Sequence, residues 1–288
     1  MSTKLKIIRP SGPTSPNNSS GRRKTFPKSS GSGRVISVTS GKAGVGKSII
    51  AANLACALKQ NHNLNVALVD LSLQFGDQGL MFAAETEPSL VNILSSIHDL
   101  TPEFLISCMH QTNGISLLTA PPSPEQADLF ERQHFNSLLE VLKGSFDLII
   151  LDLSSHLSDV TLEALECSDA ILVITSSHLA SVKGAKLLLK ILHDLRIEDE
   201  KILLILNHSE ASLKVESKEL ESQIKYPILT SLPYSGSALL ASIVEGVPLF
   251  ATKPKSDFGE QITLISSSLN TSHPKTLKPS RKKILGFV

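Results

Sequence analysis

The sequence predicts an α/β protein with a mostly parallel, twisted sheet and helices on both of its faces. Short apolar runs rich in β-branched residues alternate with longer stretches of helical periodicity, and strands buried on both faces have this pattern. A glycine-rich loop also joins the first expected strand to the first expected helix. The expected strands are residues 35–38, 66–69, 115–118, 148–151, 170–174, 202–206 and 228–232. The main expected helices are residues 49–58, 123–142, 181–195 and 237–244.

Two helix starts are marked by a shared tripeptide pattern. Thr101-Pro102-Glu103 and Ser123-Pro124-Glu125 each offer a hydroxyl cap, a proline for the first helical position and an acid for the first turn. The sequence therefore predicts that helices begin at these two places.

Composition limits the class of protein. The chain of 288 residues is 41% hydrophobic and 19% charged, as is ordinary for a globular protein. No apolar run reaches the ~18–20 residues of a membrane span, and the basic N-terminal stretch lacks the apolar core of a secretory signal. Its three cysteines are scattered and form no CxxC pair. These features favour a cytoplasmic protein with buried thiols.

Charge is distributed unevenly along the chain. Residues 1–33 carry seven basic and no acidic side chains, and residues 270–288 carry five basic and no acidic ones. Removing these twelve positive charges from the net charge of +1 leaves −11 on residues 34–269. The first segment, rich in Ser, Pro, Gly and Asn, is expected to be a disordered basic tail, and the last a basic C-terminal tail. The segment between them is expected to be the folded domain.

The strongest motif is a phosphate-binding loop after the first expected strand. The segment fits G-x-x-x-x-G-K-[ST] and precedes a helix, which is the setting that the motif requires. Its glycines let successive N–H groups face a phosphate chain, its second lysine neutralises β/γ oxygens, and its serine hydroxyl can ligate Mg²⁺. The sequence therefore predicts binding of ATP with Mg²⁺. The residues of the loop are Gly41, Lys42, Ala43, Gly44, Val45, Gly46, Lys47 and Ser48.

Lys42 adds a second lysine early in the loop. This arrangement resembles the deviant Walker A motif of the MinD/ParA superfamily of P-loop NTPases. The resemblance implies a homodimer formed with ATP, in which this lysine reaches the partner subunit's phosphates and stabilises developing negative charge. Ala43 departs from the usual glycine, and its methyl group fits only if its φ is negative.

The resemblance covers about residues 34–269 and is greatest to the CpaE/TadZ branch, the MinD-like ATPases of pilus assembly. Its motifs are residues 66–76, 120–127, 146–152, 232–234 and 246–249, in this order. It implies a slow ATPase that positions or recruits a pilus or secretion assembly at the membrane. It also implies a membrane-associated assembly protein as partner and a peripheral location at the inner membrane.

The resemblance also implies site residues. Asp70 and Asp152, the Walker B aspartate, match carboxylates at C-terminal strand ends that hold Mg²⁺ together with Ser48. Lys42, Lys47 and Asp152 match catalytic positions. Ser72 stands where the family usually has an aspartate that positions the attacking water, and serine lacks that basicity. Hydrolysis is therefore less secure than binding.

Two further residues match the contacts of the base. Asn207, at the end of an apolar strand, matches the residue that contacts adenine, and Pro233 matches the loop that covers the base.

Two other functions stay open. One is a ParA-like DNA-partition ATPase, since basic tails suit DNA phosphates as well as an anionic membrane. The other is a non-hydrolysing, ATP-bound scaffold, which Ser72 suggests. The final residues, 281–288, combine basic and apolar side chains and are similar to the membrane-targeting tip of MinD.

Overall fold

The computed structural model describes residues 32–208 and 217–270. The two predicted basic tails, residues 1–33 and 270–288, therefore lie almost entirely outside the described residues. Within the described residues, no helix is both long and apolar enough to span a membrane.

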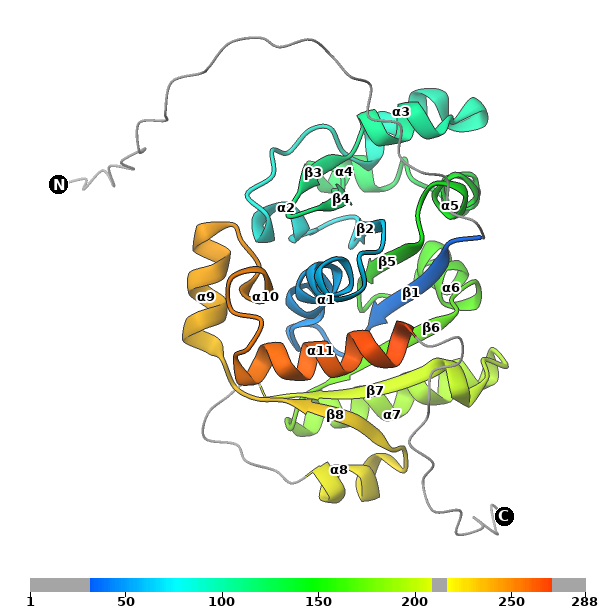
Figure 1. Ribbon diagram of the computed structural model, residues 1–288. Helices are drawn as coiled ribbons and strands as arrows, with labels where there is room; N and C mark the ends of the chain where they lie inside the picture. Colours follow the sequence, from blue (N-terminus) through cyan, green and yellow to red (C-terminus); the bar gives the residue numbers. More distant parts are fainter. Residues whose placement is uncertain (1–31, 209–216, 271–288) are drawn as a thin grey trace, which may run out of the picture.

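An eight-stranded sheet forms the centre of the molecule, in the order β3-β4-β2-β5-β1-β6-β7-β8 (Figure 1). All neighbouring strands are parallel except β3 and β4, which pair antiparallel at one edge. The predicted mostly parallel α/β fold is thus confirmed. The strands are β1 (Arg34–Thr39), β2 (Val66–Leu71), β3 (His110–Thr112), β4 (Ile115–Leu118), β5 (Leu148–Leu153), β6 (Ala170–Thr175), β7 (Ile202–Asn207) and β8 (Ile228–Leu232).

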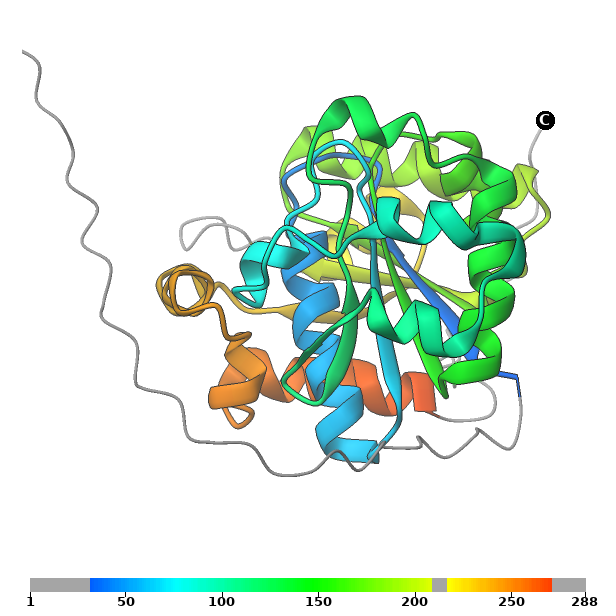
Figure 2. The same cartoon turned by 90° about the horizontal axis from the view of Figure 1, so that it is seen from above.

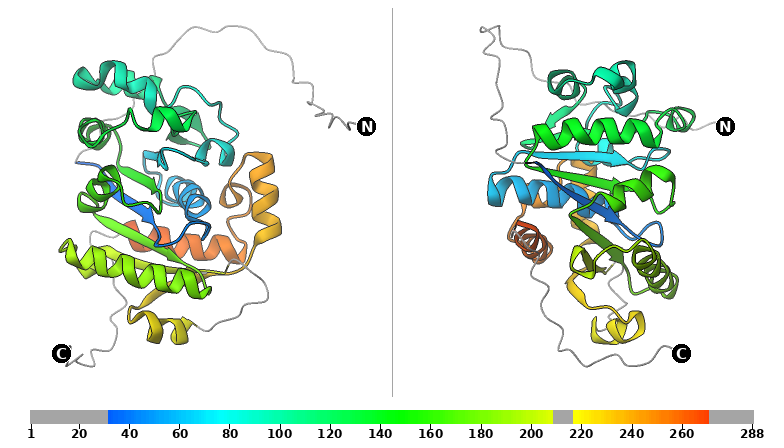
Figure 3. Two further views of the ribbon diagram at one scale, coloured as in Figure 1. Left: turned by 180° about the vertical axis from the view of Figure 1, so that it is seen from behind. Right: turned by 90° about the vertical axis from the view of Figure 1, so that its right-hand side faces the viewer.

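Helices cover both faces of the sheet, as Figure 3 shows from the side. Buried side chains of α1, α10 and α11 form the core on one face, and those of α5, α6, α7 and α8 form the core on the other. Alternate residues of one strand serve the two cores: Val35 packs on the second face, and Ile36 and Val38 pack on the first. The helices are α1 (Lys47–His62), α2 (Gln78–Met81), α3 (Pro102–Ser107), α4 (Pro124–Ala127), α5 (Arg132–Ser145), α6 (Asp159–Glu166), α7 (Leu179–Asp194), α8 (Ser217–Ile224), α9 (Gly236–Glu245), α10 (Leu249–Thr252) and α11 (Asp257–Asn270).

Short elements complete the described chain. Two 3-10 helices, η1 (Leu90–Asp99) and η2 (Asp199–Lys201), connect larger elements. Helix α9 lies at the margin of the molecule, as the view from above also shows (Figure 2), and Ser242 is its one buried residue.

The helix expected over residues 123–142 is instead two helices, α4 and α5. Phe130, between them, is buried in the core, and Glu131 is extended and caps α5 together with His134. Burial of this one phenylalanine therefore outweighs the helical periodicity. The predicted cap at Thr101 is confirmed, since its Oγ1 accepts from Phe104 N at 3.2 Å. Ser123 precedes α4 without a side-chain capping bond.

Candidate nucleotide and magnesium site

The phosphate loop lies between β1 and α1, at the carboxyl ends of the central strands. Gly44 and Gly46 have φ of 80° and 92°, in the left-handed region that favours glycine. Ala43 is not among the residues with positive φ, so its methyl group is accommodated without strain. Helix α1 begins directly after Gly46 with no side-chain cap, which leaves first-turn N–H groups for an anion.

Gly41, at the start of the loop, packs against the backbone of α7. A Cβ on Gly41 would lie 2.0 Å from the carbonyl oxygen of Gly184, and one on Gly184 would lie 2.4 Å from that of Gly41. Neither position has room for a side chain. The start of the phosphate loop is thereby held against α7, the helix that follows β6.

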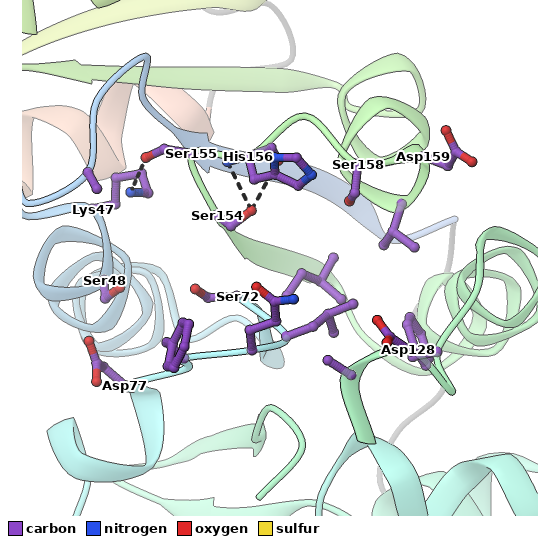
Figure 4. A pocket seen from close by; sticks show the side chains of 18 of the residues that line it. Lys47, Ser48, Ser72, Asp77, Asp128, Ser154, Ser155, His156, Ser158 and Asp159 are labelled. Atoms are coloured by element: carbon purple, nitrogen blue, oxygen red, sulfur yellow. Dashed lines mark hydrogen bonds between the residues drawn. The ribbon is translucent and has the colours of Figure 1, made fainter. Parts of the chain in front are cut away.

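The side chain of Lys47 points into the site and contacts the loop after β5. Its Nζ donates to Ser155 Oγ at 3.0 Å (Figure 4), and Ser155 Oγ lies 3.1 Å from Ser40 Oγ. Ser40 in turn donates to the carbonyl oxygen of Lys42 at 2.6 Å. Burial lowers the pKa of the Lys47 ammonium, and the charge of Asp152 acts in the opposite direction. The loop after β5 thus contacts the lysine that is predicted to bind β/γ phosphates.

Asp70 and Asp152 form a buried pair of carboxyl groups at the ends of β2 and β5, where they are register partners. Burial raises the pKa of both groups, and the charge of Asp152 raises that of Asp70 further. Asp70 accepts from the backbone N–H groups of Ser72 and Gln78, each at 3.0 Å. A cation beside this pair would relieve the cost of the two charges.

Gln78, the first residue of α2, joins the pair to the phosphate loop. Its side-chain Nε2 donates to Asp152 Oδ2 at 2.8 Å and to the carbonyl oxygen of Ser48 at 2.9 Å. Asp152 Oδ1 is buried and forms no hydrogen bond of standard geometry among the described residues, although the Ser48 side chain is close enough to act on the pKa of Asp152 in the lowering direction. A buried carboxylate oxygen without a donor beside a P-loop serine fits Mg²⁺, which takes few protein oxygens and keeps several waters.

The described part of the chain has no cluster of three or more His, Cys, Asp or Glu side chains suited to a metal ion. A magnesium ion at the phosphate loop would be held by Ser48, Asp70 and Asp152, the three residues predicted, together with water.

A cavity of about 1190 Å³ opens beside the loop. Three of its labelled lining residues, Ser72, Asp77 and His156, come from the loops after β2 and β5 (Figure 4). Asp77 is exposed, and Phe75 is 75% exposed at the same cavity. Among the predicted residues, the cavity is lined by Ala43, Gly44, Gly46, Lys47, Ser48 and Ser72.

The two residues predicted to contact adenine do not line this cavity. Asn207 lies at the end of β7, where its Nδ2 donates to the carbonyl oxygen of Val45 at 2.8 Å. Asn207 therefore reaches the phosphate loop. Pro233 follows β8 and is half-buried, and it is not brought to the cavity.

Sequence reasoning missed Gln78, Ser155 and Gly184. Gln78 follows Asp77 at the start of α2, and it belongs to no sequence motif. Ser155 could have been considered because it lies three residues after Asp152, in the loop at the end of β5.

Comparison with known proteins gives a consistent result. The family model AAA_31, an AAA domain, matches residues 33–205. The chain is 27% identical to an uncharacterized ATP-binding protein of Methanocaldococcus jannaschii over 239 residues, which cover 81% of this chain and 86% of that protein.

Two solved structures are similar to this one. A ParA family ATPase from Chlorobium tepidum TLS matches with a TM-score of 0.75 and 28% identity, over 81% of this chain and 98% of that chain. The septum site-determining protein MinD from Pyrococcus horikoshii OT3, complexed with Mg-ADP, matches with a TM-score of 0.70 over 83% of this chain and 96% of that chain. Its identity is 20%, so this likeness shows the fold alone.

Proposed function

Because this chain belongs to the AAA_31 family, as a P-loop ATPase of the MinD/ParA type, we propose that it is an ATP-switched dimer. It binds ATP with Mg²⁺, hydrolyses it slowly, and positions or recruits a pilus or secretion assembly at the membrane. One observation carries the nucleotide part: Lys47, at the start of α1, is close enough to the buried Asp152 for the two charges to interact, and Asp152 is paired with Asp70. The pilus assignment rests on the resemblance to the CpaE/TadZ branch.

The site offers distinct groups for each part of Mg·ATP. The glycine-rich loop and the start of α1 supply N–H groups for the phosphates, and Lys47 supplies a positive charge for the β/γ oxygens. Ser48, Asp70 and Asp152 would hold the magnesium ion, which neutralises phosphate charge when bound. Asn207 and Pro233 are proposed to contact the base. Such a site favours phosphoryl transfer by positioning and charge stabilisation.

Lys42 supports the dimeric part of the proposal. Its side chain is exposed at the phosphate loop, and among the described residues it forms no ion pair within its own subunit. A second subunit facing the loop would receive this lysine at its phosphates.

A ParA-like DNA-partition ATPase is the second candidate, favoured by the 28% identity to a ParA family ATPase. The two functions differ in the anionic surface that the protein binds. Co-sedimentation with vesicles containing anionic lipid and with duplex DNA, each with Mg·ATP and at several salt concentrations, separates them. Binding to DNA but not to vesicles would favour partition.

Nucleotide binding is tested by calorimetry. Lys47→Ala removes a charge-assisted contact worth ~1.5–3 kcal/mol, so the affinity for Mg·ATP should fall by roughly one to two orders of magnitude. Lys190→Ala, which removes an exposed lysine near the end of α7, is the matched control and should bind as the wild type does. Equal affinities for the wild type and Lys47→Ala would contradict the proposal.

A further inference from the structure

We propose that Gln78 is a positioning residue for magnesium: it holds Asp152 and the turn containing Ser48 in the arrangement that the ion requires. The inference rests on the proposed function, because it concerns the same Mg·ATP site. It adds a residue that belongs to no motif of the sequence.

The contacts of Gln78 reach all three predicted magnesium residues. Its Nε2 donates to Asp152 Oδ2 at 2.8 Å and to the carbonyl oxygen of Ser48 at 2.9 Å. Its backbone N–H donates to Asp70 Oδ2 at 3.0 Å. The residue is 0% exposed, so these bonds do not compete with bulk water. One residue of α2 thus fixes one residue from the phosphate loop and one from each of two strands.

Two buried oxygen atoms of this arrangement lack hydrogen-bond partners among the described residues, which suits a hydrated metal ion. Gln78 Oε1 and Asp152 Oδ1 are both buried, and neither has a hydrogen-bond partner within residues 32–208 and 217–270. Both are oxygen acceptors, so a cation or its bound water supplies what they lack. Mg²⁺ keeps several waters in its coordination shell and suits such a pair of acceptors.

A tight backbone brings Gln78 to this position. A Cβ on Gly76 would lie 2.5 Å from Asp70 Oδ2 and 2.3 Å from Ala120 Cβ, so the loop after β2 passes directly over Asp70. Helix α2 then starts at Gln78 with its side chain turned toward Asp152. Glutamine has the length and the two N–H donors for the pair of bonds, whereas methionine has similar length and no donor.

A purely structural role would predict a different result. If Gln78 only fills space, its loss should lower stability and weaken ATP binding with and without magnesium alike. If Gln78 positions the magnesium residues, the loss should fall on the magnesium-dependent part of binding. Residues that orient metal ligands through hydrogen bonds typically account for ~10–100-fold in metal affinity.

The experiment compares ATP affinity in Mg²⁺ with ATP affinity in EDTA, by calorimetry, for wild type, Gln78→Met and Gln60→Met. Gln60 is exposed on α1, so its replacement is the matched control. The ratio of the dissociation constant for ATP in EDTA to that in Mg²⁺ measures how much magnesium increases the affinity for ATP, which we call the magnesium gain. We expect this gain to fall by roughly 10-fold or more in Gln78→Met, with the affinity in EDTA and the value for Gln60→Met unchanged.

Electron paramagnetic resonance of Mn²⁺ in place of Mg²⁺, with ATP, gives a second readout. The wild type and Gln60→Met should give one bound-ion spectrum, and Gln78→Met a weaker or altered one.

The outcomes are distinguishable. An unchanged magnesium gain in Gln78→Met overturns the inference and leaves the proposed function intact. A wild type that binds no ATP contradicts the proposed function, and the inference with it. If circular dichroism shows that Gln78→Met does not fold, Gln78→Asn takes its place. Asparagine keeps the amide, but its side chain is too short to form both hydrogen bonds. The magnesium gain should therefore also be lower in this variant than in the wild type.

Discussion

Gly41 and Gly184 touch backbone to backbone, with no space between the phosphate loop and α7 for a side chain on either residue. The nearest atoms to an added Cβ are main-chain atoms on both sides, which cannot rotate away. The position of the phosphate loop is therefore coupled to the position of α7, a helix that carries none of the residues predicted to bind the nucleotide or magnesium.

Gly184→Ala should displace the loop and weaken ATP binding by about tenfold, while overpacking lowers stability by ~1–3 kcal/mol. Gly144→Ala is the control, because a Cβ on this glycine of α5 meets no atom within 4 Å. That variant should bind ATP normally and gain ~0.5–1 kcal/mol of stability. Calorimetry and urea unfolding of both variants check the prediction. Normal ATP binding by Gly184→Ala would show that the loop does not depend on this contact.

Asp152→Asn should stabilise the protein in buffer with EDTA, and more so as the pH rises. Burial raises the pKa of both Asp152 and Asp70 in the folded state. With both carboxyl groups protonated, below the unfolded pKa of about 4, the folded protein does not carry the cost of their buried charges. This advantage is lost as the pH rises through their folded-state pKa. The neutral amide of Asp152→Asn cannot ionise and avoids this loss of stability. The melting temperature of the variant should therefore exceed that of the wild type by a few °C at pH 8, which corresponds to on the order of 1 kcal/mol in the free energy of unfolding. Thermal melts at pH 4 and pH 8 measure it, and an equal difference at both pH values would contradict it.

Lys42→Ala should prevent the dimer from forming in Mg·ATP. The affinity of the single subunit for Mg·ATP should remain largely unchanged. Lys42 is exposed, whereas Lys47 points into its own site. Sedimentation at micromolar concentration should give a dimer for wild type and mostly monomer for Lys42→Ala. Lys253→Ala, at another exposed lysine, is the control and should dimerise. A wild type that stays monomeric in saturating ATP would count against the dimeric switch.

Ser72→Asp should hydrolyse ATP faster than the wild type. Ser72 lines the cavity but lacks a carboxylate, and loss of a general base typically costs ~10²–10⁴-fold in rate. Steady-state phosphate release measures the gain, and binding should change little because Lys47 and Ser48 remain. If the variant shows no gain, another group positions the water. Asp77 is then the first residue to replace, since its exposed carboxylate lines the same cavity.

Much of the fold could be predicted because its signals are local. Each of the seven predicted strands is present, and each differs from the expected bounds by at most two residues at either end. Strand β3 was missed because His110–Thr112 is polar and its pairing depends on β4. The break between α4 and α5 was missed because burial of Phe130 is a tertiary effect.

The residues of the candidate site also fall into those that local sequence reveals and those that only tertiary contacts reveal. The phosphate loop is contiguous in sequence, so its residues could be identified, and the predicted MinD/ParA membership is confirmed by the family model and the similar structures. The CpaE/TadZ branch stays a prediction. Gln78 and Gly184 could not be found, because their roles arise from contacts with residues that are distant in sequence.

The hydrogen bond from Asn207 to the carbonyl oxygen of Val45 limits how this protein could be redesigned for another nucleotide. A Cβ at Gly46 would lie 2.5 Å from the same Nδ2, so loop and amide fit each other closely. Replacing Asn207 to alter the preferred base would loosen the loop for every triphosphate, purine or pyrimidine. Selectivity must therefore be engineered at positions that leave this amide in place.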